Sequence, residues 1–390
     1  MHIRVCWHRR CSKTGMTARP AAPSSRLRHR SPVPDRPLRV GYVPMTDCAP
    51  LVAAHEFGLF ERHGLRVILS REPGWATVRE KMILGELDAC QAPASMVFEL
   101  SCGLGVVTTP SLTGLVTAHN GNAITLSNEL RDLGVRDVWS LRRLIDRHRG
   151  SRRFIFAGVL AYSSQHYLMR KWLRSGGIDP ERDVDIIFLP PPQINVCLGA
   201  GHIDGCCVAE PWSSVGLLRG IGWCVTLSAD FDPMHPEKVF MVRAHFDRDH
   251  HENHLRLVAA LIEAARWCDQ PASRAELADI LSSPRYLDIP RDTIANALIG
   301  PFRMGMDQET PATNAIVFHR NDANRPTVAK ARWVLHEIHT HRLGDGLPEL
   351  SDSEIRERYR EDIYEEALAL VAPPRRARPR AASPAFASVA

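Results

Sequence analysis

The sequence predicts an α/β protein with two lobes, and three observations lead to this prediction. A Gly-x-apolar-Asp segment at 85–90 recurs at 201–206, which is 116 residues later. Around both copies apolar, strand-like runs alternate with helix-like stretches, a pattern that indicates parallel sheets with helices on both faces. Each copy therefore corresponds to one β-α-β-α-β unit. Two such lobes create a cleft at the carboxyl ends of their strands, where open α/β sheets bind ligands.

The first copy is predicted to contain three strands and two helices. Thr46 and Asp47 supply an N-cap for the first helix, and Pro50 is tolerated in its first turn. Gly85 ends the second helix, which follows a turn that carries Trp75. In chain order the predicted elements are strand 38–44, helix 49–64, strand 65–70, helix 76–84 and strand 87–92.

The second copy repeats this order. Its predicted elements are strand 154–160, helix 165–177, strand 184–189, and a helix and a buried strand within 190–210. The last strand must stop before Pro211, because proline cannot donate to a strand ladder. Cys206 and Cys207 lie in this strand, and adjacent side chains of a strand face opposite ways. They are therefore interpreted as core filling and not as a metal site.

The chain crosses between the two copies twice, which makes the first lobe discontinuous. Residues 1–37 and 372–390 are predicted to be disordered, because they are rich in Arg and Pro and have little capacity to form a core. The predicted parts between them are lobe 1 at 38–127 plus 228–345, lobe 2 at 128–227 and a C-terminal helix at 346–371.

The charge of the chain is unevenly distributed. Residues 1–36 carry +8 and residues 371–390 carry +4, which leaves −7 for residues 37–370 out of a total of +5. A nucleic-acid-binding face on the folded body is therefore not indicated.

Two features of the sequence predict a cytoplasmic protein. Residues 1–37 contain no apolar core of about 7–15 residues, which a secretory signal needs, and no run reaches the roughly 18 apolar residues of a membrane span. The ten cysteines are scattered without a C-x-x-C pair, a distribution that indicates a reducing compartment.

Two acidic patterns have a structural and a functional interpretation. Asp88 and Asp204 occupy the same place in the two copies. They could form a functional pair of carboxylates. We favour the structural interpretation, in which each aspartate accepts hydrogen bonds from backbone amides where a strand begins. The run Asp249–His254 resembles a metal cluster but lacks the spacing of a zinc helix. We interpret it as a solvated helix N-terminus, and we expect no metal or other cofactor and no catalytic residue.

Four side chains predict the chemistry of the cleft. Trp75, Asn122, His166 and Lys238 each lie just past a predicted strand end or at a helix start. Together they offer an indole N–H, an amide, an imidazole and an ammonium group, which are nearly all hydrogen-bond donors. A pocket of donors suits a small oxyanion, and the predicted helix N-terminus at Ser163 also favours negative charge.

Five motifs in order give the chain a resemblance to a known family. They are Gly41–Leu51, Trp75–Arg79, Pro190–Gln193, Cys207–Trp212 and His235–Lys238. With these segments the chain resembles the nitrate/bicarbonate-binding proteins of the NrtA/CmpA type over roughly residues 38–300. The resemblance implies a type II periplasmic-binding-protein fold, in which two α/β lobes close on a ligand.

The resemblance also implies anion-binding residues. The Trp, His and Lys that contact nitrate in the family fall on Trp75, His166 and Lys238, and the family Gln falls on the shorter Asn122. A Gly that contacts the ligand through its backbone is replaced by Ala209. The resemblance leaves nitrate, nitrite and bicarbonate open, and Lys238 favours the nitrate type.

Without an export signal, the chain is most similar to the cytoplasmic nitrate/nitrite sensor branch of the family (NasS). This similarity implies a protein partner, an ANTAR-type RNA-binding antiterminator like NasT, which the sensor releases when the anion binds. The alternative is the solute-binding subunit of an ABC importer. An enzyme of the same fold is a weaker alternative, because only the fold supports it.

Overall fold

The computed structural model describes residues 36–305, 308–311, 314–341 and 347–371. The predicted disordered segments, 1–37 and 372–390, lie outside the described residues apart from residues 36 and 37. Among the described helices, none combines the length and the apolar character needed to cross a membrane.

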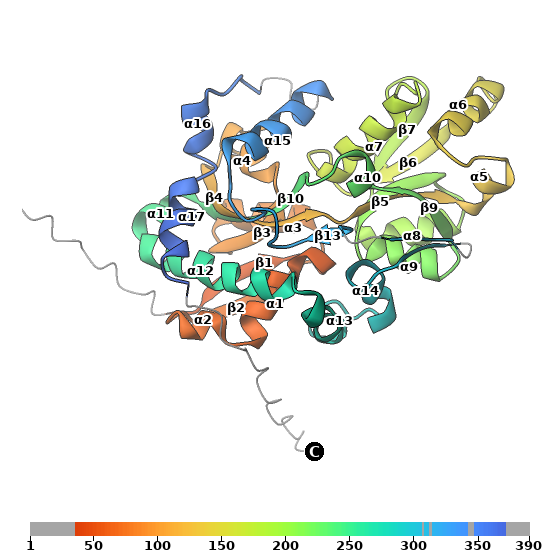
Figure 1. The fold of residues 1–390 in the computed structure, drawn as a ribbon. Coiled ribbons are helices and arrows are strands. Elements are labelled where there is room, and N and C mark those ends of the chain that lie inside the picture. The colour runs from red at the N-terminus through yellow and green to blue at the C-terminus, as the bar shows by residue number, and fades with distance from the viewer. Residues whose placement is uncertain (1–35, 306–307, 312–313, 342–346, 372–390) are drawn as a thin grey trace, which may run out of the picture. The chain divides into compact units, whose positions relative to one another are not determined.

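Two sheets of six and five strands carry the fold (Figure 1). The strand order is β13-β4-β10-β3-β1-β2 in the first sheet and β7-β6-β8-β5-β9 in the second, and β11 and β12 form a small third sheet. The strands are β1 (Leu38–Tyr42), β2 (Val67–Arg71), β3 (Ala89–Pro93), β4 (Ser111–Asn120), β5 (Asn122–Ser127), β6 (Phe154–Gly158), β7 (Val184–Phe188), β8 (Gly205–Ala209), β9 (Gly222–Leu227), β10 (Pro236–Arg243), β11 (Phe302–Gly305), β12 (Gln308–Thr310) and β13 (Ile316–Val317).

Helices connect these strands and also form most of the chain beyond β10. They are α1 (Ala49–Glu56), α2 (Leu59–Arg62), α3 (Trp75–Leu84), α4 (Met96–Cys102), α5 (Asn128–Asp132), α6 (Val138–Arg147), α7 (Ser164–Ser175), α8 (Pro191–Gly199), α9 (Trp212–Leu218), α10 (Ser228–Phe231), α11 (Ala244–Asp249), α12 (His251–Cys268), α13 (Arg274–Ser282), α14 (Arg291–Leu298), α15 (Val328–Thr340), α16 (Asp352–Arg356) and α17 (Glu361–Leu368).

The predicted α/β fold with two repeated units is confirmed. In the first sheet β1 pairs in parallel with β2 and β3, and in the second β6 pairs in parallel with β7 and β8. Each unit then takes an antiparallel strand from elsewhere in the chain, β10 beside β3 and β5 beside β8. Lys238 lies opposite Pro93 in the first sheet, and Asn122 lies opposite Ala209 in the second. Pro93 and Ala209 are 116 residues apart, so Lys238 and Asn122 hold equivalent positions.

The first crossing between the sheets occurs earlier than predicted. The sequence places residues 122–127 in lobe 1, but β5 pairs with β8 and β9 of the second sheet. The polypeptide changes sheet at Asn120 and Gly121, both of which have left-handed φ angles of 61° and 86°. Such angles cost little for glycine and are tolerated by asparagine.

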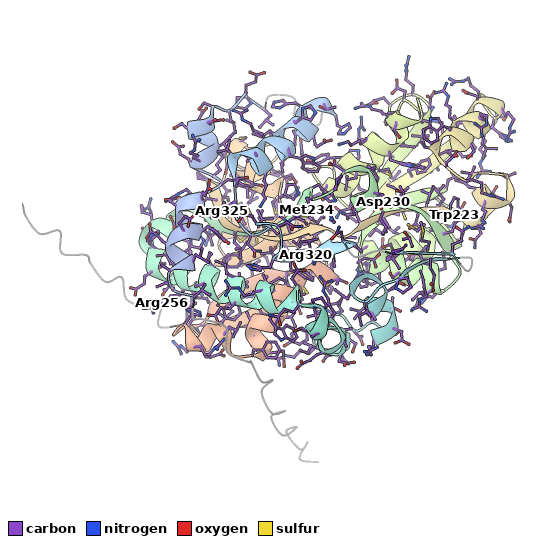
Figure 2. All side chains as sticks on the ribbon, viewed as in Figure 1. Trp223, Asp230, Met234, Arg256, Arg320 and Arg325 are labelled. Atoms are coloured by element: carbon purple, nitrogen blue, oxygen red, sulfur yellow. The ribbon has the colours of Figure 1, made fainter. Side chains whose placement is uncertain are left out.

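The two crossing segments are hydrogen-bonded to each other. The side-chain oxygen of Asn120 accepts from the amide of Met234 at 2.9 Å, and the Asn120 amide donates to the carbonyl of His235 at 3.2 Å. Met234 has a positive φ of 61° as well. Figure 2 labels Asp230, which lies in α10, and Met234, which lies on the second crossing between α10 and β10.

The repeated aspartates begin the strands of both units, as predicted. Asp88 accepts from the amide of Arg39 at 2.8 Å and from both guanidinium nitrogens of Arg36 at 2.7 Å. Asp204 accepts from the amide of Ile155 at 2.7 Å and from Arg152 at 2.5 Å. Arg36 and Arg152 are also 116 residues apart, so the whole arrangement is repeated.

Apolar side chains fill both faces of each sheet. The α1 and α12 helices pack side by side against the first sheet (Figure 1), within a core that includes Phe60, Leu261 and Phe240. In the second sheet Cys206 and Cys207 belong to different apolar clusters. They therefore lie on opposite faces, as predicted for adjacent residues of a buried strand.

One prediction about the later part of the chain is wrong, and a second is right only in part. The single C-terminal helix predicted at 346–371 is two helices, α16 and α17, and Tyr359 between them donates to the carbonyl of Ala94 at 2.8 Å. The predicted solvated run Asp249–His254 is partly interior. His254 is fully buried, and its Nδ1 lies 2.8 Å from the carboxylate of Asp247.

Candidate functional site

Lys238 lies at the carboxyl-terminal edge of the first sheet. Because β10 runs antiparallel to β3, its first residues lie beside the last residues of β3, and Lys238 pairs with Pro93. The pairing of β10 with β4 shifts register on both sides of Lys238, which marks a β-bulge. A bulge redirects side chains, and here it brings the side chains of Glu237 and Lys238 into contact although they are neighbours in a strand.

Lys238 pairs with two carboxylates in the interior. Its ammonium nitrogen lies 3.0 Å from Oδ2 of Asp47 and also contacts Oε1 of Glu237. The residues Asp47, Glu237 and Lys238 are 2%, 0% and 0% exposed. With all three groups ionised this triad has a net charge of −1. The sequence-based expectation of a site made almost entirely of donors is therefore wrong.

The three groups differ in how their environment affects ionisation. Burial opposes the charge on Lys238, but Asp47 and Glu237 raise its pKa, so the ammonium group stays charged. Burial likewise opposes the charge on Glu237, but Lys238 and His235 lower its pKa. For Asp47 burial prevails over the attraction of Lys238, and the nearby Glu237 adds to it, so the pKa is raised. Asp47 is therefore the carboxylate of the pair whose surroundings favour the protonated form.

Glu237 also links the triad to the second sheet. It accepts from the side-chain amides of Asn122 and Gln165, each at 2.6 Å, and Gln165 donates to the Asn122 oxygen at 2.8 Å. Asn122 begins β5, and Gln165 lies in the first turn of α7, whose N-cap is the hydroxyl of Ser163. The site is thus built from the carboxyl-terminal edges of both sheets.

Trp75 borders the triad and has a free donor. It begins α3, is 2% exposed, and its ring centroid lies 5.2 Å from the ammonium nitrogen of Lys238. Its indole nitrogen and the hydroxyl of Thr46, next to Asp47, have no hydrogen-bond partner among the described residues. Buried donors usually have partners. These two are therefore the donors best placed to receive a ligand oxygen.

The structure brings together four of the five predicted site residues. Trp75 contacts Lys238, Asn122 reaches Lys238 through Glu237, and Ala209 lies opposite Asn122 in the second sheet. His166 makes its contacts elsewhere. Its Nδ1 donates to the carbonyl of Ala161 at 2.8 Å, and its ring packs against Phe188 with centroids 4.9 Å apart.

The protonation state of His166 fits these contacts. Burial lowers its pKa to about 3, so the ring is neutral, and Nε2 accepts from Arg170 at 3.4 Å. Its neighbour Gln165, one helical step away, is the residue of α7 that reaches the triad. The role of His166 as a ligand residue stays a prediction.

Sequence reasoning missed three members of the site. The sequence assigns Asp47 to a helix cap, gives no role to Gln165 beside His166, and presents Glu237 only as part of the motif His235–Lys238. The contact of Glu237 with Lys238 depends on a bulge, which the sequence does not reveal. Asp47 carried one signal, since it follows the first predicted strand directly.

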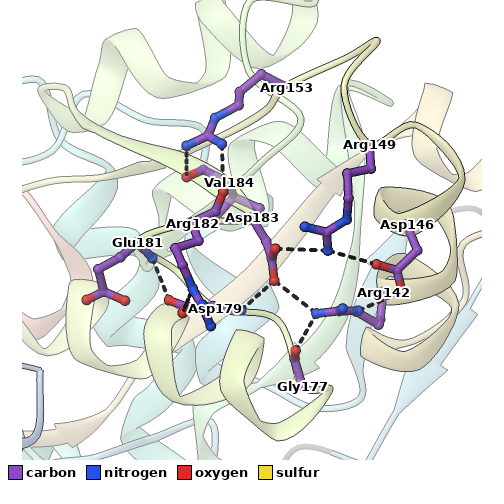
Figure 3. Close-up of polar contacts among 10 residues, drawn as sticks. All are labelled: Arg142, Asp146, Arg149, Arg153, Gly177, Asp179, Glu181, Arg182, Asp183 and Val184. Atoms are coloured by element: carbon purple, nitrogen blue, oxygen red, sulfur yellow. Dashed lines mark hydrogen bonds and ion pairs between the residues drawn. The ribbon is translucent and has the colours of Figure 1, made fainter.

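A charged cavity of the second lobe, away from the triad, has no unpaired cation among its arginines. It has a volume of about 330 Å³ and is lined mainly by arginines of the second lobe, Arg149, Arg152, Arg153 and Arg182. Each of them already pairs with a carboxylate. Figure 3 shows the guanidinium groups of Arg142 and Arg149 meeting on Asp183, at 2.9 and 3.1 Å. Within the described residues no group of three or more His, Cys, Asp or Glu side chains could hold a metal ion.

Two sheets of one topology, whose carboxyl-terminal edges meet at a buried polar site, give the two-lobed α/β fold that is also found in periplasmic solute-binding proteins. The NMT1-like family matches residues 31–282, and the chain belongs to this family.

Its relatives include nitrate and bicarbonate proteins. It is 36% identical to the nitrate import ATP-binding protein NrtC of Synechocystis sp. over 77% of this chain and 45% of NrtC. It is 30% identical to the bicarbonate-binding protein CmpA of Synechococcus elongatus over 69% of this chain and 62% of CmpA. The chain thus spans 45% and 62% of the lengths of these two relatives, less than two thirds of either.

The fold matches that of a solved nitrate-binding protein. The periplasmic nitrate-binding protein NrtA from Synechocystis PCC 6803 superposes with a TM-score of 0.81, at 25% identity, over 86% of this chain and 89% of NrtA. The same fold also occurs in the desulfurization enzyme DszB, with a TM-score of 0.57 and 12% identity. Fold alone therefore does not decide between binding and catalysis.

Proposed function

We propose that this protein binds a small oxyanion, nitrate or nitrite, between its two lobes. The observation that carries the proposal is the buried ammonium group of Lys238, at the edge where the two sheets meet, beside the indole N–H of Trp75, which has no hydrogen-bond partner among the described residues. Both groups donate hydrogen bonds to an oxyanion, and the ammonium group supplies charge. The family relationship to nitrate- and bicarbonate-binding proteins supports this assignment.

The proposed role of anion binding is to signal and not to catalyse. In this proposal the protein is cytoplasmic, holds an ANTAR-type RNA-binding antiterminator, and releases it when the anion favours one arrangement of the lobes. Linkage requires that anion and partner weaken each other's binding by the same factor. The eight described cysteines are free thiols, six of them buried, which is compatible with a reducing compartment.

A second candidate is the solute-binding part of an importer for nitrate, nitrite or bicarbonate. The observation in its favour is that the curated relatives are named as parts of import systems. The two candidates share the site and differ in partner and location. Cell fractionation separates them, because the importer role needs the protein outside the cytoplasm.

Calorimetric titration with nitrate, nitrite and bicarbonate tests the binding function. Nitrate has only four heavy atoms, and a ceiling of roughly −1.5 kcal/mol per atom limits the binding free energy to about −6 kcal/mol, a dissociation constant of tens of micromolar or weaker. The expected result is a measurable heat of binding for nitrate or nitrite, with a dissociation constant that agrees with this limit. Absence of binding by all three anions contradicts the proposal.

Co-purification with a candidate antiterminator tests the signalling role. The complex should form without anion and dissociate in millimolar nitrate. The variant Trp75→Phe should require more nitrate for the same release, because it keeps the interface and loses a ligand contact. A complex that nitrate and nitrite both leave intact contradicts the sensor mechanism.

A further inference from the structure

The charge of the site limits how an anion can enter it. Lys238 is the cation of the buried triad, and two carboxylates, Asp47 and Glu237, already neutralise it with one negative charge to spare. A bound monoanion raises this excess to two negative charges in a site that solvent does not reach. Like charges in a buried site strongly disfavour each other's ionised form. Anion binding at Lys238 therefore requires compensation.

Protonation of one group at the site compensates the charge without moving the fold. The titratable groups that face Asp47 and its partners are Glu237 and Lys238 in β10, His235 just before this strand, and Cys48 next to Asp47 in the chain. Lys238 is already protonated, and burial raises the pKa of the Cys48 thiol, which keeps it neutral. The remaining candidates are Asp47, Glu237 and His235.

Hydrogen bonding separates these candidates. Glu237 accepts from two side-chain amides and from Lys238, and acceptors with several donors stay ionised. His235 stacks on Trp333, and Glu237 lies 3.7 Å from its Nδ1. Its proton would mainly neutralise Glu237 and would leave Asp47 facing the anion. Asp47 accepts from Gln91 at 2.5 Å and otherwise depends on Lys238, the same group that the anion needs.

We propose that the anion binds together with one proton and that Asp47 holds this proton. The inference rests on the proposed anion site and extends it, because it names the species taken up as the anion plus H⁺. Charge balances: the triad changes from −1 to zero on protonation and returns to −1 with the monoanion in place. A protonated carboxyl also donates one hydrogen bond, so Asp47 changes from a competitor for Lys238 into a donor for the anion.

Linkage gives the direction of the pH dependence. A bound anion raises the pKa of Asp47 further. At pH values between the pKa of Asp47 in the free protein and its pKa in the anion-bound protein, one proton is taken up for each anion. Within that window affinity falls about tenfold for each unit rise in pH. Below the window Asp47 is already protonated, and affinity is constant.

Calorimetry with nitrate tests the inference on the intact chain. Nitrate is the suitable probe because it does not titrate between about pH 5.5 and 8.5. Titrations in two buffers of different ionisation enthalpy measure the protons taken up, and the expected value approaches one within the window. This measurement needs no variant and so does not depend on how a substitution folds.

The variant Asp47→Asn assigns the proton to its residue. It should bind nitrate at least tenfold more tightly than the unmodified protein at about pH 8.5, with no pH dependence and no proton uptake. Asp204→Asn is the matched control, since Asp204 is a largely buried carboxylate whose pKa burial raises, at the opposite edge of the second sheet. It should keep both the affinity and the pH slope.

The outcomes of these experiments test the proton uptake separately from the anion binding itself. If the unmodified protein binds nitrate with no proton uptake at any of these pH values, the inference is wrong and the anion site stands. If Asp47→Asn keeps the dependence of nitrate affinity on pH, the proton lies on another group and the inference is wrong. The same holds if His235→Gln loses this dependence and Asp47→Asn does not. If the unmodified protein binds none of the anions, the proposed function itself is wrong.

Discussion

The two edges of the repeated sheets behave in opposite ways. At the amino-terminal edge both copies use the same chemistry. An aspartate, Asp88 or Asp204, accepts from the backbone amide of a strand residue and from the side chain of the arginine three residues before that strand residue. At the carboxyl-terminal edge equivalent positions carry different residues, Lys238 in one sheet and Asn122 in the other. The amino-terminal edge, where the two copies agree, begins strands. The carboxyl-terminal edge, where they differ, forms the candidate site.

This difference shows how a duplicated unit can acquire one asymmetric site. Two equivalent lysines would bring like charges together between the lobes, which is unfavourable in a buried site. An amide at the second position instead accepts and donates without adding charge, and Asn122 supports Glu237, which in turn contacts Lys238. The predictions below test the contrast between the two edges, from the largest expected effect to the smallest.

Lys238→Met should have the largest effect. It leaves Asp47 and Glu237 buried without their cation, and breaking a buried pair in this way costs about 3–5 kcal/mol of folding free energy. Nitrate binding should be lost. The orphaned carboxylates fold most easily when protonated, so their folded pKa values rise and the loss of stability should shrink as pH falls. Urea unfolding at about pH 5 and pH 8 measures this.

Asn122→Ala, at the equivalent position of the second sheet, is the matched control for Lys238→Met. It removes hydrogen bonds to Glu237 and Gln165 but no charge, so it should cost about 1–3 kcal/mol, with little change between the same two pH values. An equal loss in the two variants contradicts the asymmetry that we ascribe to the carboxyl-terminal edge.

Gln165→Ala and His166→Ala should separate two neighbours on α7. Loss of Gln165 leaves Glu237 with fewer donors, so Glu237 holds Lys238 more tightly and nitrate affinity should fall about tenfold, or about 1.4 kcal/mol. His166→Ala should leave the affinity within about twofold, because its ring contacts Ala161 and Phe188. A larger loss in His166→Ala restores the sequence-based assignment.

Trp75→Phe should weaken nitrate binding by about 1 kcal/mol, since it removes the indole N–H and keeps an aromatic ring beside Lys238. Trp139→Phe is the control, because Trp139 on α6 is 60% exposed, whereas Trp75 is buried beside Lys238. Calorimetry with nitrate compares the two variants. Equal affinities in the two variants contradict a role for the Trp75 donor.

Asp88→Asn and Asp204→Asn should have the smallest effects. Each keeps an oxygen that accepts the strand amide and loses a partly exposed ion pair, so each should cost about 1 kcal/mol or less. The two costs should be similar, because the two arrangements are repeated, and nitrate affinity should not change. Unequal costs of more than about 1 kcal/mol show that the two amino-terminal edges differ after all.

The sequence predicts the scaffold better than the site, for physical reasons. The repeat and the alternation of strands and helices determine the parallel units, and Asp88 and Asp204 follow from the repeat alone. The position of β5 in the second sheet was missed, because a ten-residue apolar strand and the next strand are separated by the single residue Gly121.

The site depends on features that the sequence pattern does not show. The bulge at Lys238 brings the Glu237 side chain to the side of the strand on which Lys238 lies. The rotation of α7 about its axis places Gln165, and not His166, in contact with Glu237. Both are differences of one residue, which determine the side of a strand or the face of a helix. The positions of Trp75 and Lys238 at this edge were predictable, because each lies next to a strand end or a turn.

The measurement that tests the central claim most directly is a crystal structure of the protein grown with nitrate. The account predicts planar density between the lobes, with one oxygen about 3 Å from the ammonium nitrogen of Lys238 and another about 3 Å from the indole nitrogen of Trp75. Nitrate bound at the arginines of the second lobe instead, with Lys238 still paired only with Asp47 and Glu237, would contradict it.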